Sequence, residues 1–345
     1  MIEIFMIIEG GYFKMKTALV TSVGSVASDI VIKTVKKYDF RIIGCDIYAK
    51  ELVVDANNVT VFYKAPYVNQ SEKYYDFIKS LCIQEKIDFI IPLIDLEVDF
   101  FNEHREWFAE HQVTLCMSPK DSIDIIRNKK KLQDFLAENC SYINSIPTYM
   151  LHETETPKWE YPVVCKPYNG RSSQGLRYIQ NIDEWMIAKN LGDKTLIVEP
   201  FIAGPIVMVE IVREPRQNKV VSMTRREVLS TPHGCATTVY LYEDTALEES
   251  CEKLAEALNI VGCVNFEFIQ DEDGKYWFVE CNPRFSAGTE FSCMAGYDLV
   301  LNHIKCFLGD PIEDFHFQHE MIIARKYEEY ITSVCQSVEY MDTIR

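Results

Sequence analysis

The chain has 345 residues, a hydrophobic fraction of 48% and a charged fraction of 25%, the balance of a globular protein with two or three packed units. Its formal net charge of −17 argues against nucleic acid or an anionic membrane as a partner. The twelve cysteines contain no CxxC pair and no zinc-type spacing, so we expect reduced cysteines in a cytoplasmic protein.

Residues 1–15 precede the first regular pattern. The apolar run Ile2–Ile8 contains Glu3, lacks a basic flank and is too short to span a bilayer, so neither a membrane helix nor a signal peptide is expected. Met15 stands directly before the strand-like region Thr17–Thr21 and looks like a natural start. Residues 1–14 are therefore either a genuine extension or the product of an upstream start codon.

Residues 16–118 alternate between strand and helix patterns. A strand, a turn at Gly24, a helix and a second strand ending at Asp46 are followed by a helix around Lys73–Glu85 and the apolar strand "DFIIPLI" before Asp95. This alternation predicts a Rossmann-like α/β domain with a parallel sheet. The turn has one glycine instead of GxGxxG, which does not favour a dinucleotide site. We expect the loop ends of the sheet to face a shared cleft.

The rest of the chain mixes helices with strand pairs. Two helices are predicted after Ser118-Pro119, with Asn139 near the end of the second. The later predicted elements are strands within 161–179 and 194–205, an amphipathic helix at 246–260, strands at 263–270 and 275–282, and a helix near 299–309. No repeat or low-complexity linker separates them, so we expect tightly packed domains.

The segment "CVNFEFIQDEDGKYWFVECN" predicts a β-hairpin. As a two-residue type I′ turn, Asp273-Gly274 places Glu267 opposite Glu280, and Asn265 opposite Asn282, all on one face. Carboxylates directly opposite one another lie roughly 5 Å apart and repel, so a cation is expected between them.

Ligands that offer only oxygen, without His or Cys, suit Mg²⁺ or Mn²⁺. The alternative is a solvated acidic face without a ligand. The run Asn282-Pro283-Arg284 weighs against it, because it adds another oxygen donor and then a cation.

Magnesium usually completes its shell with waters and phosphates, so a phosphate-binding segment is expected elsewhere. Lys166 ends an apolar strand and leads into a loop with small residues that let backbone N–H groups approach a phosphate: Gly170, Ser172, Ser173 and Gly175. The lysine precedes the loop, unlike in a P-loop. Lys129 in "RNKKKL" could supply a second positive charge, and a solvated lysine is the alternative there.

The ordered set of these motifs resembles the ATP-grasp ligases, in particular the branch of the carbamoyl-phosphate synthase large chain, with a single ATP-grasp unit. The resemblance runs from Lys16 to about Gly309, and "NFEF…VECNPRFS" is its most specific element. It implies a pre-ATP-grasp domain at 16–118 and an ATP-grasp domain at 119–315. Within the latter it implies a lid subdomain at about 146–199 and a catalytic subdomain at about 200–315, before a C-terminal segment at 316–345.

The resemblance also implies roles for single residues. Lys129 and Lys166 would touch ATP phosphates, and residues 170–175 would form the flap over them. The hinge would be Glu199, facing the adenine amino group, with Phe201 and Ile202 as backbone partners. The implied metal ligands are Glu267, Glu280 and Asn282, and the implied catalytic residues are Lys166 and Arg284, the latter at the reacting phosphoryl group.

One departure concerns the ribose. Many relatives carry an acid shortly after the hinge, where this chain has Ile206 and Val207, so that Glu210 or another group would have to serve. "RFSAGTEF", which contains Gly288, is similar to a branch that joins small carboxylates to amines. Arg225 or Arg226 could hold a substrate carboxylate, and a surface arginine pair is the alternative.

The resemblance implies an ATP-dependent ligase that phosphorylates a small carboxylate to an acyl phosphate and couples it to an amine, releasing ADP and phosphate. ATP and Mg²⁺ (or Mn²⁺) are the expected cofactors, and a homodimer is left open. The alternative is a non-catalytic, nucleotide-binding regulatory protein on a degenerate ATP-grasp scaffold. A single unit without a biotin-carrier segment does not favour complete carbamoyl-phosphate synthesis or biotin carboxylation.

Overall fold

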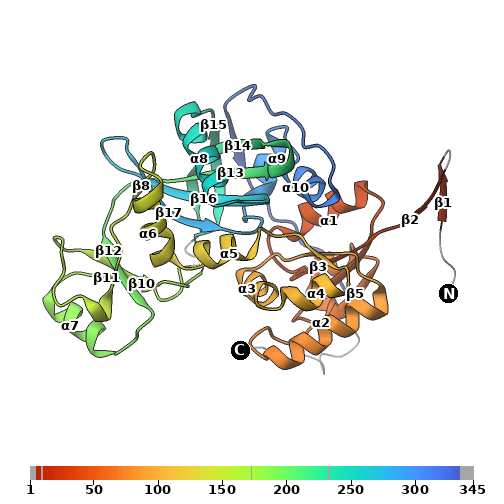
Figure 1. Ribbon diagram of the computed structural model, residues 1–345, viewed down its shortest axis with the longest axis horizontal. Coiled ribbons are helices and arrows are strands. Elements are labelled where there is room, and N and C mark those ends of the chain that lie inside the picture. The colour runs from red at the N-terminus through yellow and green to blue at the C-terminus, as the bar shows by residue number, and fades with distance from the viewer. Residues whose placement is uncertain (1–4, 9–10, 172, 232–233, 335–345) are drawn as a thin grey trace.

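The computed structural model describes residues 5–8, 11–171, 173–231 and 234–334, which form a small hairpin and three larger sheets (Figure 1). The hairpin pairs β1 (Phe5–Ile8) with β2 (Gly11–Lys14) and projects from the rest of the molecule in Figure 1. Among the described residues, no helix combines the length and apolar character needed to cross a membrane.

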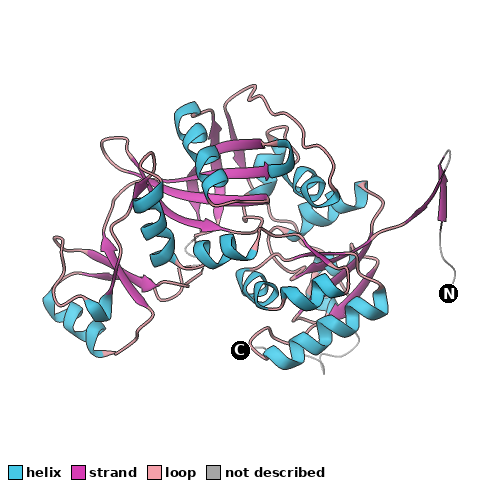
Figure 2. Ribbon diagram, viewed as in Figure 1, coloured by secondary structure: helices cyan, strands magenta, loops and turns pink. Residues whose placement is uncertain are grey.

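The amino-terminal domain is built on a parallel sheet in the order β5-β4-β3-β6-β7, as the alternating pattern predicted. Its elements are β3 (Thr17–Thr21), α1 (Ser28–Lys37), β4 (Arg41–Asp46), β5 (Val61–Lys64), α2 (Ser71–Glu85), β6 (Phe89–Ile91), α3 (Asp95–Glu103), α4 (Arg105–Glu110) and β7 (Thr114–Leu115). Every residue of β3 is buried, because helices cover both faces of the sheet (Figure 2).

A seven-stranded sheet in the order β18-β15-β14-β13-β16-β17-β8 forms the centre of the molecule. Its strands are β8 (Asn144–Ser145), β13 (Ile206–Glu214), β14 (Lys219–Ser230), β15 (Ala236–Tyr242), β16 (Gly262–Gln270), β17 (Tyr276–Asn282) and β18 (Met321–Ala324). The helices around it are α5 (Lys120–Ile126), α6 (Lys129–Asn139), α8 (Thr245–Ala257), α9 (Thr289–Met294) and α10 (Leu299–Leu308). The predicted ends of α5 and α6, at Pro119 and Asn139, agree with these bounds.

The core is shared between this sheet and the amino-terminal domain. One buried cluster joins Leu19 of β3 to Val209 of β13 and Leu254 of α8. A second cluster joins Val31 of α1 to Val300 of α10. The amino-terminal domain and the large sheet are therefore packed directly against each other.

The third sheet has the order β11-β10-β12-β9 and lies at one end of the molecule in Figure 1; we refer to it as the lid sheet, after the subdomain expected there. Its strands are β9 (Tyr149–Met150), β10 (Val163–Pro167), β11 (Arg177–Ile179) and β12 (Leu196–Pro200), and the helix α7 (Ile182–Asn190) lies between β11 and β12 in the chain. Its buried cluster around Trp185 contains only residues between 149 and 198, so the lid has a core of its own.

The acidic hairpin of β16 and β17 has the predicted partners but not the predicted turn. Glu267 faces Glu280 and Asn265 faces Asn282. The turn, however, is a three-residue loop, because the Asp271 N–H donates to the Lys275 carbonyl and Gly274 takes a φ of +80°. The predicted type I′ turn at Asp273-Gly274 is wrong.

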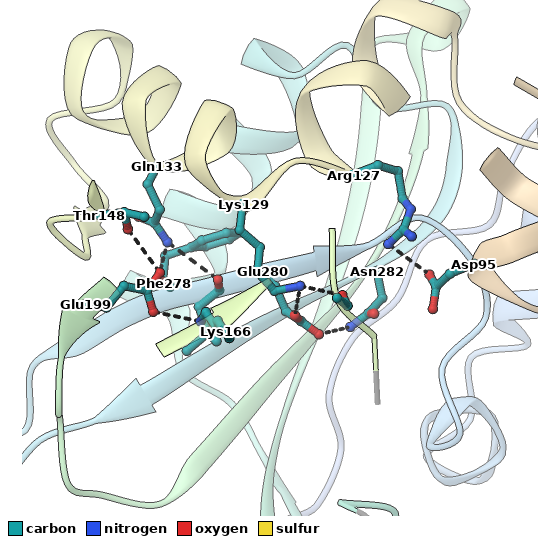
Figure 3. A network of polar contacts seen from close by, with 12 residues as sticks. Asp95, Arg127, Lys129, Gln133, Thr148, Lys166, Glu199, Phe278, Glu280 and Asn282 are labelled. Carbon is teal, nitrogen blue, oxygen red and sulfur yellow. Dashed lines mark hydrogen bonds and ion pairs between the residues drawn. The ribbon is translucent and has the colours of Figure 1, made fainter. Parts of the chain in front are cut away.

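A β-bulge restores the alignment that this loop would have shifted. The register slips by one residue between Glu267 and Phe268, and Val279 is the extra residue on β17. A bulge leaves a carbonyl of the ladder without its partner. The Gln133 side chain of α6 donates to the Phe278 carbonyl at 2.8 Å and thereby satisfies it (Figure 3).

We propose the domain boundaries expected from the sequence, with one adjustment. β18 lies in the segment 316–345, yet it pairs with β15 at the edge of the large sheet. We therefore count the chain up to Ala324 with the catalytic subdomain.

Candidate active site

A cavity of about 550 Å³ lies between the lid sheet and one face of the large sheet. Its walls include most of the residues singled out from the sequence: Lys129, Lys166, Gly170, Ser173, Glu199, Phe201, Ile202, Arg225, Glu267, Glu280, Asn282, Arg284 and Gly288. Gly175, Glu210 and Arg226 are not part of the wall, and Ser172 lies outside the described residues.

The two lysines each hold a carboxylate on the cavity wall (Figure 3). Lys166 Nζ lies 2.7 Å from Glu199 Oε2, and Thr148 Oγ1 donates to the other Glu199 oxygen at 3.0 Å. Burial disfavours the charged form of Lys166, but the Glu199 carboxylate outweighs this and raises the lysine pKa. Lys166 therefore remains a cation inside the cavity.

Lys129 is the first residue of α6, and Asn128 caps that helix by accepting from the Lys131 N–H. Its Nζ lies 2.9 Å from Glu280 Oε2 and donates to the Gly170 carbonyl at 2.7 Å. With a side chain only 10% exposed, Lys129 is not the solvated lysine that was the alternative. Lys129 thus contacts both the loop that begins at Gly170 and Glu280 of the acidic hairpin.

The facing carboxylates differ in their charge environment. Burial and then the charge of Glu280 raise the pKa of Glu267 to about 8. Burial acts on Glu280 in the same direction, but the ammonium groups of Lys129 and Lys166 lower its pKa overall. Near neutral pH the pair therefore carries about one negative charge, on Glu280, which Lys129 neutralises, while Glu267 keeps its proton until a cation binds beside it.

The donor set fits a magnesium ion that shares its shell with phosphates. Glu267, Glu280 and Asn282 offer carboxylate and amide oxygens on one face. Asn265 is fully buried beside them, and neither polar atom of its side chain has a hydrogen-bond partner. In the part of the chain that the structure describes, no three His, Cys, Asp or Glu side chains are placed to hold a metal. An ion bound by Glu267, Glu280 and Asn282 would take its remaining ligands from water or phosphate.

Arg284 projects into the cavity and is held by the amino-terminal domain. Its Nη2 donates to Asp95 Oδ2 at 2.9 Å and to Asn282 Oδ1 at 3.4 Å. Asp95 also lies 3.5 Å from Arg127 (Figure 3). The sequence reasoning assigned no role to Asp95, Arg127, Thr148 or Gln133. For Asp95 a signal existed, because it follows a buried parallel strand whose end was expected at a cleft.

Arg225 also belongs to the cavity wall and is buried under Gly288. Its Nη1 binds Glu210 Oε1 at 2.7 Å, and its Nη2 binds Ser286 Oγ at 3.2 Å. Any Cβ on residue 288 would lie 2.4 Å from Arg225 Nη2, so glycine is required there for this contact.

These contacts correct two expectations. Glu210 is 0% exposed, and its carboxylate accepts hydrogen bonds from Arg225 and Ser286. The structure therefore does not place Glu210 where it could contact a ribose. Arg226 is exposed and follows Arg225 along β14, so it points away from the cavity. Arg225 is not a surface arginine, since it is only 2% exposed.

Comparison with known families agrees with this architecture. Residues 192–329 match the family model described as "ATP-grasp in the biosynthetic pathway with Ter operon". Residues 18–116 match the model "PylC-like, N-terminal domain". The chain therefore combines a PylC-like amino-terminal domain with an ATP-grasp domain. The family and the fold class predicted from the ordered motifs are thereby confirmed.

Among curated proteins, this ATP-grasp chain is 23% identical over 284 residues to pyruvate carboxylase of Komagataella pastoris, covering 73% of this chain and 23% of that protein. It is 27% identical over 191 residues to D-alanine–D-alanine ligase of Campylobacter concisus, covering 52% of this chain and 55% of that protein. The chain thus spans between about a quarter and about half of the length of these relatives.

A similar solved structure is the biotin carboxylase domain dimer of 2-oxoglutarate carboxylase from Hydrogenobacter thermophilus, in complex with MgADP, ADP and bicarbonate. The TM-score is 0.74 at 17% identity, covering 91% of this chain and 75% of that chain. At this identity the likeness concerns the ATP-grasp fold.

Proposed function

We propose that the chain is an ATP-dependent ligase that phosphorylates a small carboxylic acid and joins it to an amine, releasing ADP and phosphate. One observation carries the proposal. The facing pair Glu267 and Glu280 lies in a single cavity with the cations Lys129, Lys166 and Arg284. Paired carboxylates beside several cations suit a nucleoside triphosphate with its divalent metal.

The nucleotide would lie across the cavity from the hinge to the acidic hairpin. Glu199, with Phe201 and Ile202, would face the base, and Lys129 and Lys166 would balance phosphate charge. Glu267, Glu280 and Asn282 would hold Mg²⁺, which when bound neutralises charge on the transferring phosphoryl group. Glu210 would not hold the ribose, because it is fully buried and does not line the cavity.

The reaction would proceed in two transfers. A carboxylate oxygen of the acid attacks the γ-phosphorus, the bond to the β–γ bridging oxygen breaks, and ADP leaves with that oxygen. An amine then attacks the acyl carbon, phosphate leaves, and the amine loses a proton. Arg284 would stabilise charge on the phosphoryl group and on the acyl oxygen, a contribution typically worth about 3 kcal/mol of barrier.

The test is a screen of pooled small carboxylic acids and amines with MgATP, with nucleotide products separated by chromatography. We expect ADP to appear only when a matching acid is present. Glu280→Gln should abolish this release. Glu313→Gln is the matched control, because Glu313 pairs with Lys305 at 2.6 Å outside the cavity. AMP as the product would overturn the mechanism, and nucleotide binding without ADP release would favour a regulatory protein.

A further inference from the structure

Asp95 of the amino-terminal domain contacts Arg284, which lines the cavity. Asp95 is the first residue of α3, and its side chain is only 4% exposed. Its Oδ2 accepts from Arg284, a residue 189 positions later in the chain. A carboxylate from one domain thus binds the cation that the other domain presents to the cavity.

Asp95 is itself fixed in place. Arg127 lies 3.5 Å from its Oδ1 and is anchored to Asp99 of the same helix by bonds of 2.6 and 2.8 Å. Burial opposes ionisation of Asp95, but Arg284 and Arg127 together lower its pKa. The carboxylate is therefore charged and has little freedom to move.

Arg284 has few other restraints. Its Nη1 donates to the Phe285 carbonyl at 3.1 Å, and among the described residues its one other hydrogen bond besides that to Asp95 is the 3.4 Å bond to Asn282. An arginine side chain has many rotamers, and a rigid charged partner selects one of them. The contact with Asp95 engages Nη2, while the side chain stays 18% exposed on the cavity wall.

We propose that Asp95 is a positioning residue for Arg284, so that the amino-terminal domain completes the phosphoryl-transfer site. This inference rests on the proposed function. The competing explanation is that the pair only fastens two domains together, in which case its loss lowers stability and leaves the chemistry unchanged.

Three variants separate these explanations: Asp95→Asn, Asp95→Glu and the control Asp99→Asn. Asp99 binds Arg127 from the same helix but does not contact Arg284. The probes are MgADP and MgADP with fluoroaluminate, whose affinities are measured by calorimetry, and the slow hydrolysis of MgATP by water. None of these probes requires the cognate acid.

Asp95→Asn should leave MgADP affinity unchanged and lower both fluoroaluminate-complex affinity and hydrolysis by about a hundredfold, the typical loss for a catalytic group displaced by an ångström. Asp95→Glu keeps the charge for folding and should give an intermediate loss. Asp99→Asn leaves the direct contact between Asp95 and Arg284 in place and should lose far less than Asp95→Asn. Adding Asp95→Asn to Arg284→Gln should cause no further loss. The ratio of the two affinities does not depend on the folded fraction.

An Asp95→Asn protein with the wild-type affinity ratio and hydrolysis rate would overturn the inference while the proposed function stood. A loss that adds in full to that of Arg284→Gln would assign Asp95 to domain fastening. Wild-type protein that binds no MgADP and releases no ADP would overturn the proposed function, and the inference with it.

Discussion

Glutamine in place of Glu267 should stabilise the metal-free protein, whereas glutamine in place of Glu280 should destabilise it. The two acids face each other, but only Glu280 has a lysine partner, at 2.9 Å from Lys129. Glu267→Gln removes the repulsion and breaks no ion pair. Glu280→Gln removes the same repulsion but leaves the Lys129 ammonium, with its side chain 10% exposed, without its counter-charge.

The magnitudes follow from these contacts. Relief of like charges directly opposite one another in a sheet is worth up to about 1 kcal/mol. Loss of a bond to a charged group costs about 1.5–3 kcal/mol, which exceeds that gain. For a chain of this size, 1 kcal/mol corresponds to roughly 2 °C in melting temperature. At pH 8.5, where Glu267 is ionised, we expect Glu267→Gln to melt about 2 °C above wild type and Glu280→Gln a few degrees below it.

The advantage of Glu267→Gln should depend on pH. In the folded protein Glu267 has a pKa raised to about 8, so it keeps a proton that the unfolded chain releases near its ordinary value of 4.5. Below pH 4.5 the acid is neutral in both states, and glutamine offers no advantage. Between pH 4.5 and 8 the unfolded state is increasingly favoured by ionisation. The stability difference should therefore grow over this interval and level off above pH 8.

The assay is thermal melting in a metal chelator at pH 5 and pH 8.5, with Glu313→Gln as the control and ADP release measured in parallel. Both Glu267→Gln and Glu280→Gln should lose turnover, since both acids would hold the metal. The reasoning fails if Glu267→Gln melts below wild type at pH 8.5, or if either variant keeps full activity.

Three further outcomes are expected. Lys166→Ala should weaken ATP binding by about 1.5–3 kcal/mol and spare adenosine binding, with Lys130→Ala, which loses only a surface pair with Asp134, as the calorimetric control. Nucleotide-free Mg²⁺ affinity should rise as pH approaches 8, because the metal displaces the Glu267 proton, and calorimetry in two buffers should detect proton release. Gly288→Ala should displace Arg225 and lower turnover at unchanged MgADP affinity, measured by steady-state kinetics.

Much of the fold could be predicted from the sequence because local patterns determine it. The buried run of β3 and the amphipathic pattern of α8 depend on nearby residues, and the structure has both. The pairing of Glu267 with Glu280 was also right, although the turn was not. A loop one residue longer than predicted and a bulge at Val279 shift the register in opposite directions and cancel.

The burial of single side chains and the contacts between residues far apart in the sequence could not be predicted in the same way. Alternation along β13 identifies the face on which Glu210 lies but not that Arg225, on the neighbouring strand, covers it. The contact between Asp95 and Arg284 joins residues 189 positions apart, and the sequence around neither residue indicates that the other is its partner. Such contacts depend on how the domains dock.

The bulge at Val279 has a consequence for recognising related sites in other sequences. Because an extra residue in the strand can offset a change in the loop, the number of residues between Glu267 and Glu280 does not by itself report which side chains face each other. A search pattern with fixed spacing would miss chains that pair the same acids with a different loop length. A search should instead require an acid on each of the two strands. For hairpins with the bulge, it should also require a side-chain amide on the neighbouring helix, such as that of Gln133, which donates to the strand carbonyl left unpaired by the bulge.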